Sequence, residues 1–104
     1  MNRYNVIMVV FDLHTITASD RRAYRNFRKF LISTGYSFIQ ESLYAKLIKS
    51  SSSCESEIRA IKSESPDEGS IIAIPMTLKD FKSIYFVRGK EFNFSEFSDP
   101  VVVF

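Results

Sequence analysis

The sequence predicts an α+β domain in which one antiparallel sheet carries two helices on the same face. Three patterns predict this class. The apolar, largely β-branched run Val6–Asp12 is typical of a central strand. Apolar residues recur at three- and four-residue spacing between Ala23 and Thr34, as in an amphipathic helix, and Tyr36–Ile48 is rich in residues that favour strands. The length of 104 residues, with 45% hydrophobic and 25% charged residues, fits one globular domain.

The first helix has a start signal and an end signal. Thr17, with Asp20 three positions later, has the form of a capping box, and Gly35 stands where a helix ends in a left-handed conformation. The region after Gly35 is expected to form two strands that meet near Gln40–Glu41. On the second of these strands, alternation predicts two faces, one with Leu43, Ala45 and Leu47 and the other with Tyr44 and Lys46.

The second half continues the alternation of strands and helices. Ser52 is expected to cap a second helix, with Cys54 on its apolar stripe as a small core residue. A fourth strand is expected at Ser70–Ile74, stopped by Pro75, and a fifth at Ser83–Arg88. The order strand, helix, strand, strand, helix, strand, with an extra C-terminal strand, is the ferredoxin-like βαββαβ arrangement.

The chain divides into a domain and an arm. Residues 1–89 form the predicted ferredoxin-like domain, and residues 90–104 form a C-terminal strand or arm. The arm is too apolar for a free end in water, so we expect it to pack on a partner subunit. The single cysteine allows neither an internal disulfide nor a cysteine-based zinc site. Packing or a second chain must therefore hold this small fold together, and a homodimer is expected.

The sequence also indicates where in the cell the protein is expected. Its apolar runs are far shorter than the roughly 18 residues that a membrane span needs. No long apolar stretch with a small-residue cleavage site follows the first residues. We therefore expect a soluble, cytoplasmic protein with no membrane partner.

The net charge of +2 is unevenly distributed. Residues 1–50 contain eight Lys and Arg against three Asp and Glu, a balance of +5, whereas residues 51–104 contain six against nine, a balance of −3. A polyanion would be attracted to the first half and repelled by the second. The asymmetry therefore indicates a nucleic-acid partner.

Most of this positive charge lies on the first helix. Its polar positions carry Arg21, Arg22, Arg25, Arg28 and Lys29, and no carboxylate follows Asp20 through residue 40. Such a face can simply be solvated, but a solubilising face normally alternates both signs of charge, because like charges at this spacing repel. Arginine matches phosphate oxygens with its fork of donors. The row therefore predicts binding to a nucleic-acid backbone without base readout.

Asp12, at the end of the first strand, is the candidate catalytic and metal-binding residue. It could accept hydrogen bonds from backbone N–H groups of the Leu13–Ser19 loop, or it could bind Mg²⁺ together with a second Asp12 across a dimer axis. His14, two residues further on, could act as a general base or have no role. Tyr36, Tyr44 and Tyr85 could stack on bases, although strand aromatics more often pack within a sheet.

Taken together, these residues resemble one family. The resemblance rests on the run Val9–Leu13, Thr15 and Thr17, the helix from Asp20 to Leu31, Gly35-Tyr36 and the segment Gln40–Tyr44. Together these segments are similar to the CRISPR-associated Cas2 family of spacer acquisition, in the version found in type II systems. The likeness is dense in the first half. The second half matches in element order and at Gly69, Thr77, Phe81 and the strand Ile84–Gly89.

The resemblance implies a homodimeric scaffold whose C-terminal strand pairs with the partner subunit. It also implies a place between two dimers of the CRISPR integrase, Cas1, where the basic helix holds the duplex DNA of the incoming spacer. Whether the arm packs on the partner subunit or on the integrase is left open. Family members are further described as magnesium-dependent endonucleases acting on RNA or DNA, with the residue matching Asp12 as metal ligand. Where the family commonly has Pro, this chain has His14, which leaves the loop less rigid. An unrelated ferredoxin-like toxin or sensor is the remaining alternative.

Overall fold

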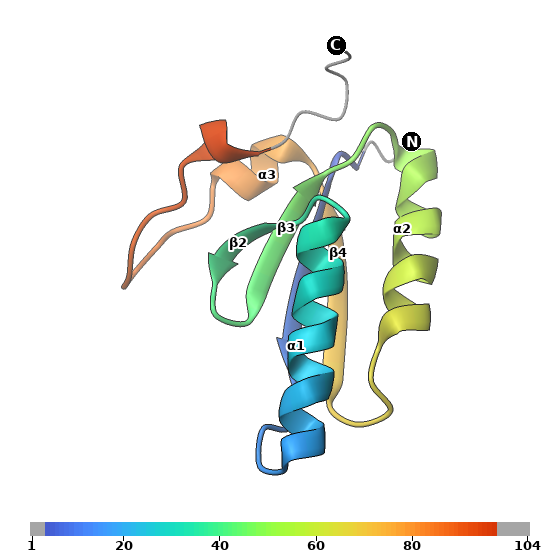
Figure 1. The fold of residues 1–104 in the computed structure, drawn as a ribbon. Coiled ribbons are helices and arrows are strands. Elements are labelled where there is room, and N and C mark those ends of the chain that lie inside the picture. Colours follow the sequence, from blue (N-terminus) through green and yellow to red (C-terminus); the bar gives the residue numbers. More distant parts are fainter. Residues whose placement is uncertain (1–3, 98–104) are drawn as a thin grey trace.

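The computed structural model describes residues 4–97. Within them the order β-α-β-β-α-β is confirmed (Figure 1). The elements are β1 (Val6–Asp12), α1 (Ala18–Ser33), β2 (Ser37–Gln40), β3 (Leu43–Leu47), α2 (Ser51–Glu64), β4 (Ser70–Met76), α3 (Leu78–Lys82) and the 3-10 helix η1 (Phe94–Glu96). No helix among the described residues is long and apolar enough to cross a membrane.

The four described strands form one antiparallel sheet in the order β2-β3-β1-β4. This is the strand order of the predicted ferredoxin-like fold. Helices α1 and α2 lie on the same face of the sheet, as Figure 1 shows. The central strand β1 pairs with β3 on one side and with β4 on the other. Its side chains are covered on both faces, because they pack alternately into the two parts of the core.

The core has one part on each face of the sheet. On the helix-covered face, Phe27 and Leu31 of α1 and Cys54 of α2 pack against β1 and Tyr44. On the opposite face, Phe81 of α3 and residues after it pack against the sheet. The predicted faces of β3 are confirmed, because Tyr44 belongs to the first part and its chain neighbours, Leu43 and Ala45, belong to the second.

The predicted capping box begins α1. The Thr17 hydroxyl accepts a hydrogen bond from the Asp20 N–H at 3.0 Å, and the Asp20 carboxylate accepts one from the Thr17 N–H at 3.1 Å. The bond from the Thr17 backbone is the main cause that lowers the pKa of Asp20. Because its pKa is lowered in the folded state, the Asp20 carboxylate stabilises the fold at pH values above the ordinary pKa of the group. This stabilisation is lost as the pH falls through the lowered pKa.

Two predicted boundaries are wrong. Strand β4 does not stop before Pro75 but continues to Met76, with Pro75 opposite Ile7. In the described sheet β4 is an edge strand, and an edge strand tolerates a proline whose missing N–H would point away from the sheet. Helix α2 begins earlier than expected, because Ser50 and not Ser52 is its N-cap; the Ser50 and Ser52 hydroxyls hydrogen-bond each other at 2.8 Å.

The predicted fifth strand, Ser83–Arg88, is not formed in this single chain. Its alternation persists, since Ile84 and Phe86 pack toward the sheet while Tyr85 and Val87 are about nine-tenths exposed. The Gln40 side chain of β2 donates to the Arg88 carbonyl at 3.4 Å, but no described strand pairs with the segment through ladder hydrogen bonds. Part of the arm, namely Phe92, Phe94 and Phe97, packs around Phe81 of the same chain. Residues 98–104 lie outside the described residues, so arm packing on a partner stays a prediction.

Candidate nucleic-acid interface

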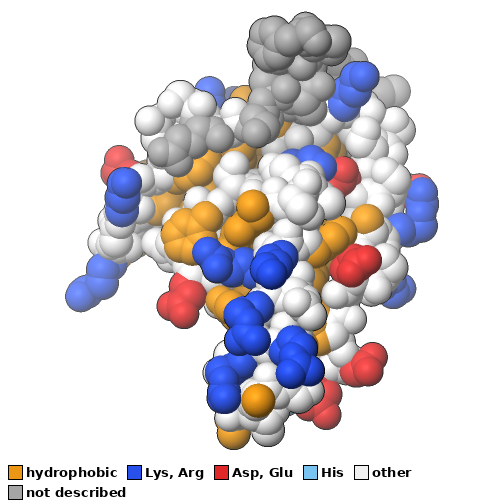
Figure 2. Space-filling view, in the orientation of Figure 1, with side chains coloured by type: hydrophobic (Ala, Val, Ile, Leu, Met, Phe, Trp, Pro, Cys, Tyr) orange, Lys and Arg blue, Asp and Glu red, His pale blue; other side chains and the backbone are white. Residues whose placement is uncertain are grey.

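The five predicted cations lie together on the exposed side of α1. All five side chains are exposed, and Figure 2 shows Lys and Arg gathered along this helix. The apolar side of the same helix, with Phe27 and Leu31, is buried in the core, so the cations have only the opposite side available. We call this set the α1 basic row; it comprises Arg21, Arg22, Arg25, Arg28 and Lys29.

The α1 basic row keeps its charge unpaired. No member forms an ion pair with any residue between 4 and 97. Two members make hydrogen bonds to neutral acceptors: Arg21 donates to the Ile16 carbonyl at 2.8 Å, and Arg28 Nε donates to the Tyr44 hydroxyl at 2.9 Å. These bonds orient two guanidinium groups without cancelling their charge, which leaves donors for an anion.

Lys46, a cation of β3, shows the contrasting arrangement. Its Nζ lies 2.9 Å from the Glu57 carboxylate of α2, and the Tyr36 hydroxyl donates to the other oxygen of that carboxylate at 3.0 Å. Burial, followed by the charge of Glu57, raises the pKa of Tyr36. Lys46 is therefore neutralised within the protein and ties α2 to the sheet, whereas the α1 basic row is available to a partner.

Asp12 is an exposed residue at the end of β1, in register with Ser70 of β4. No hydrogen bond joins its carboxylate to the Leu13–Ser19 loop or to any other part of residues 4–97. Asp20 is the carboxylate that accepts a loop N–H. Among the described residues no group of three or more His, Cys, Asp or Glu is placed to hold a metal ion. The described chain therefore offers Asp12 as a single ligand and not as a complete Mg²⁺ site.

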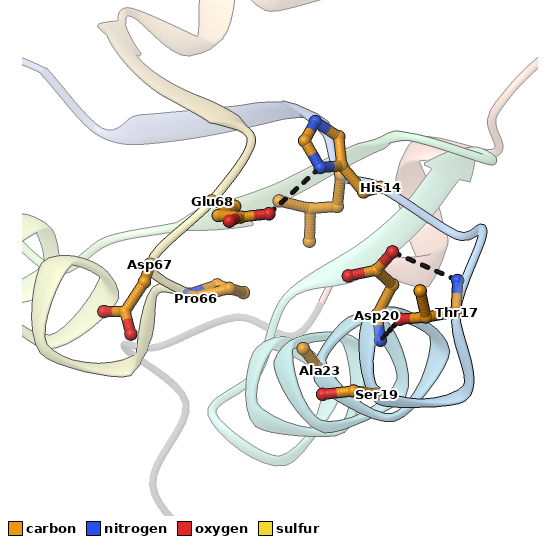
Figure 3. Close-up of a pocket in the computed structure, with 9 residues that line it drawn as sticks. His14, Thr17, Ser19, Asp20, Ala23, Pro66, Asp67 and Glu68 are labelled. Atoms are coloured by element: carbon orange, nitrogen blue, oxygen red, sulfur yellow. Dashed lines mark hydrogen bonds and ion pairs between the residues drawn. The ribbon is translucent and has the colours of Figure 1, made fainter.

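A cavity of about 430 Å³ lies between the β1–α1 loop, the first turns of α1 and the turn before β4 (Figure 3). Glu68 points toward His14, with Nδ1 and a carboxylate oxygen 3.4 Å apart, and both side chains are largely exposed. His14 therefore has a partner that the sequence did not predict. Asp20 and Asp67 also line the cavity, so its acidic character disfavours a phosphate ligand.

The three tyrosines named as possible stacking partners for bases differ in their exposure. Tyr36 and Tyr44 are buried and pack within the fold, while Tyr85 is 89% exposed but lies outside the sheet. Sequence reasoning missed Phe38, which is 53% exposed and sits opposite Tyr44 on the helix-covered face of the sheet. Its alternation with the buried Ile39 could have placed it on that face, but only the tertiary structure shows that nothing in residues 4–97 covers it fully.

The fold and the α1 basic row together define a small α+β protein with an exposed row of cations that form no ion pair among the described residues. Residues 5–84 match the family described as CRISPR associated protein Cas2. The chain is 36% identical over 98 residues to the CRISPR-associated endoribonuclease Cas2 of Streptococcus mutans serotype c (strain NN2025), covering 94% of this chain and 92% of the relative. Two further proteins of the same description are each 34% identical to this chain. The match to the protein of Acidovorax ebreus covers 80% of this chain and 81% of the relative, and the match to that of Ligilactobacillus salivarius covers 82% of this chain and 84% of the relative. The chain belongs to the Cas2 family, which replaces the alternative of an unrelated toxin or sensor.

Proposed function

We propose that this protein is a CRISPR adaptation scaffold, a cytoplasmic homodimer that holds duplex DNA with the CRISPR integrase while a spacer is acquired. One observation carries the proposal: the α1 basic row is exposed and forms no ion pair among the described residues. An unpaired row of cations on one helix face costs stability through mutual repulsion. A phosphate backbone would remove that repulsion and give the row a function.

The geometry favours contacts to phosphates over contacts to base edges. Arginine forks suit phosphate oxygens, and the cations follow one helix face for about two turns. Contacts of this kind position a duplex and carry no sequence information. They suit a protein that must accept spacers of any sequence.

The opposite face of the sheet supports the homodimer. Ile72 and Ile74 of the edge strand β4 are 54% and 39% exposed there. Exposed β-branched side chains on an edge strand are an aggregation hazard unless another surface covers them. A second copy of this chain would cover these side chains and give Ser83–Arg88 a strand to pair with.

A magnesium-dependent endonuclease that uses Asp12 is the second candidate function. It is favoured by the exposure of the Asp12 carboxylate, which has no hydrogen-bond partner among the described residues, and by the description of the relatives as endoribonucleases. The donor set of one described chain does not fit Mg²⁺, since a hard cation needs further oxygen ligands. The described residues therefore support the scaffold better than the endonuclease.

Asp12→Ala separates the two functions. The scaffold predicts that this variant binds duplex DNA within about twofold of the unmodified protein, because Asp12 lies outside the α1 basic row. Spacer acquisition in cells is expected to continue. Duplex affinity is measured by fluorescence anisotropy, and magnesium-stimulated cleavage of RNA and DNA is measured in parallel.

The matched control is Asp67→Ala, which removes the same charge from another exposed carboxylate nearby. Any general electrostatic gain in affinity should be equal in the two variants. Loss of acquisition in Asp12→Ala alone, with duplex binding intact, would contradict the scaffold and support the endonuclease.

A further inference from the structure

Phe38 is an exposed aromatic side chain beside the α1 basic row. Its ring is 53% exposed on the helix-covered face of β2, and it is the strand partner of Tyr44. The two rings meet edge to face, with centroids 5.6 Å apart and an interplanar angle of 84°. The Phe38 ring is therefore held by a neighbour while much of its surface remains open to solvent.

Arg28 reaches the same Tyr44 from α1. Arg28 Nε donates to the Tyr44 hydroxyl at 2.9 Å, and Tyr44 is completely buried. Tyr44 thus contacts an exposed cation through its hydroxyl and forms an edge-to-face pair with the exposed Phe38 ring. Because Tyr44 cannot move without disturbing the core, the cation and the ring keep a fixed relation to each other.

A cation beside a half-exposed aromatic ring suits a ligand that carries both a phosphate and a flat ring. A nucleotide with an unpaired base offers a phosphate for the cation and a flat surface for the ring. A base within a duplex is stacked between its neighbours and has no such surface available. The arrangement therefore distinguishes unpaired from paired nucleic acid without reading the sequence.

We propose that Phe38, Arg28 and Tyr44 form a subsite for one unpaired nucleotide. The base stacks on Phe38, Arg28 binds the adjacent phosphate, and Tyr44 is the positioning residue that fixes Arg28. The subsite rests on the proposed function, because the rest of the α1 basic row would bind the flanking backbone. It extends that function from duplex DNA to a strand with unpaired bases, such as a single-stranded end of a duplex.

The test uses two short single-stranded DNA oligonucleotides of equal length, one carrying bases with a central 2-aminopurine and one abasic at the central positions. Phe38→Leu keeps an apolar side chain but removes the stacking surface. We expect it to weaken binding of the base-bearing strand by about tenfold and to leave binding of the abasic strand and of a blunt duplex unchanged.

Two control variants accompany this test. Phe38→Tyr should retain both the affinity for the base-bearing strand and the quenching of 2-aminopurine fluorescence. The matched control Ile32→Ala, which truncates an aliphatic side chain that is 51% exposed on α1, should change neither strand.

Tyr44→Phe removes only the hydroxyl that fixes Arg28. It should weaken the base-bearing and abasic strands by the same factor, since it acts on the phosphate contact. Equal binding of both strands by Phe38→Leu and the unmodified protein would overturn the subsite and leave Phe38 as a protein contact. Equal losses on the abasic strand or on the duplex would also overturn it. If the unmodified protein bound no duplex at all, the proposed function would fail first, so the two failures are distinguishable.

Discussion

Replacing Arg25 and Arg28 together by Glu is expected to reduce the affinity for duplex DNA by at least about 100-fold near 0.1 M salt. Both side chains are exposed members of the α1 basic row, and neither forms an ion pair among residues 4–97. The change removes two cations that would neutralise phosphates and places two like charges against the backbone. The measurement is fluorescence anisotropy of a labelled duplex over a range of salt concentrations. The slope of log affinity against log salt should become shallower by about 0.9 for each phosphate that the protein no longer neutralises.

The matched control for this change is Arg59→Glu with Lys62→Glu on α2. Both residues are exposed, so the control alters the net charge by the same amount at a different helix. We expect a small, uniform decrease in affinity from the control. Because Arg28 also bonds Tyr44, thermal unfolding is recorded for each variant to establish that it is folded. Equal losses of affinity in the two double variants would contradict the assignment of the interface to α1.

Gly69→Ala is expected to have the largest effect on stability, a loss of at least about 2 kcal/mol. Gly69 has φ +96°, which L side chains rarely adopt. An added Cβ would lie 2.7 Å from Cδ2 of Leu13 and 2.9 Å from the carbonyl oxygen of Asp12. The backbone oxygen cannot move away without disturbing the end of β1. The melting temperature of this small domain should fall by roughly 10 °C.

Gly35→Ala is the matched control for Gly69→Ala. Gly35 has a similar φ of +99°, but an added Cβ would meet only the flexible end of the Lys46 side chain at 3.4 Å. This variant should show the conformational strain alone and lose less stability. A melting temperature for Gly69→Ala equal to that of Gly35→Ala would show that Gly69 does not lie close to Asp12 and Leu13, which would contradict the described geometry.

Much of the fold could be predicted because its determinants are local. The capping box of Thr17 and Asp20 marks the start of α1, and the alternation along β3 assigns Tyr44 and Ala45 to opposite faces. Local patterns were not sufficient for the segment Ser83–Arg88. Alternation indicates which face a side chain occupies, but a strand also needs a neighbouring strand to pair with. No described strand pairs with this segment.

The candidate site divides in the same way. The α1 basic row could be predicted because helical periodicity places five cations on one face without any knowledge of the rest of the fold. The exposure of Phe38 could not be predicted, because it depends on how far α1 and the neighbouring segments extend over β2. The environment of Asp12 was also beyond prediction: its place at the end of β1 left open backbone hydrogen bonds or a metal ion, whereas the side chain is exposed and has no hydrogen-bond partner among the described residues.

Mapping the duplex on the protein by NMR tests directly whether the α1 basic row binds nucleic acid. Amide chemical shifts of the isotopically labelled protein are followed while a blunt duplex is added at low salt. We expect the largest shifts within α1, at residues 21–29, and no change at Asp67 and Glu68 in the turn before β4. Largest shifts at Asp67 and Glu68 or on β4, with α1 unaffected, would contradict the assignment of nucleic-acid binding to the α1 basic row.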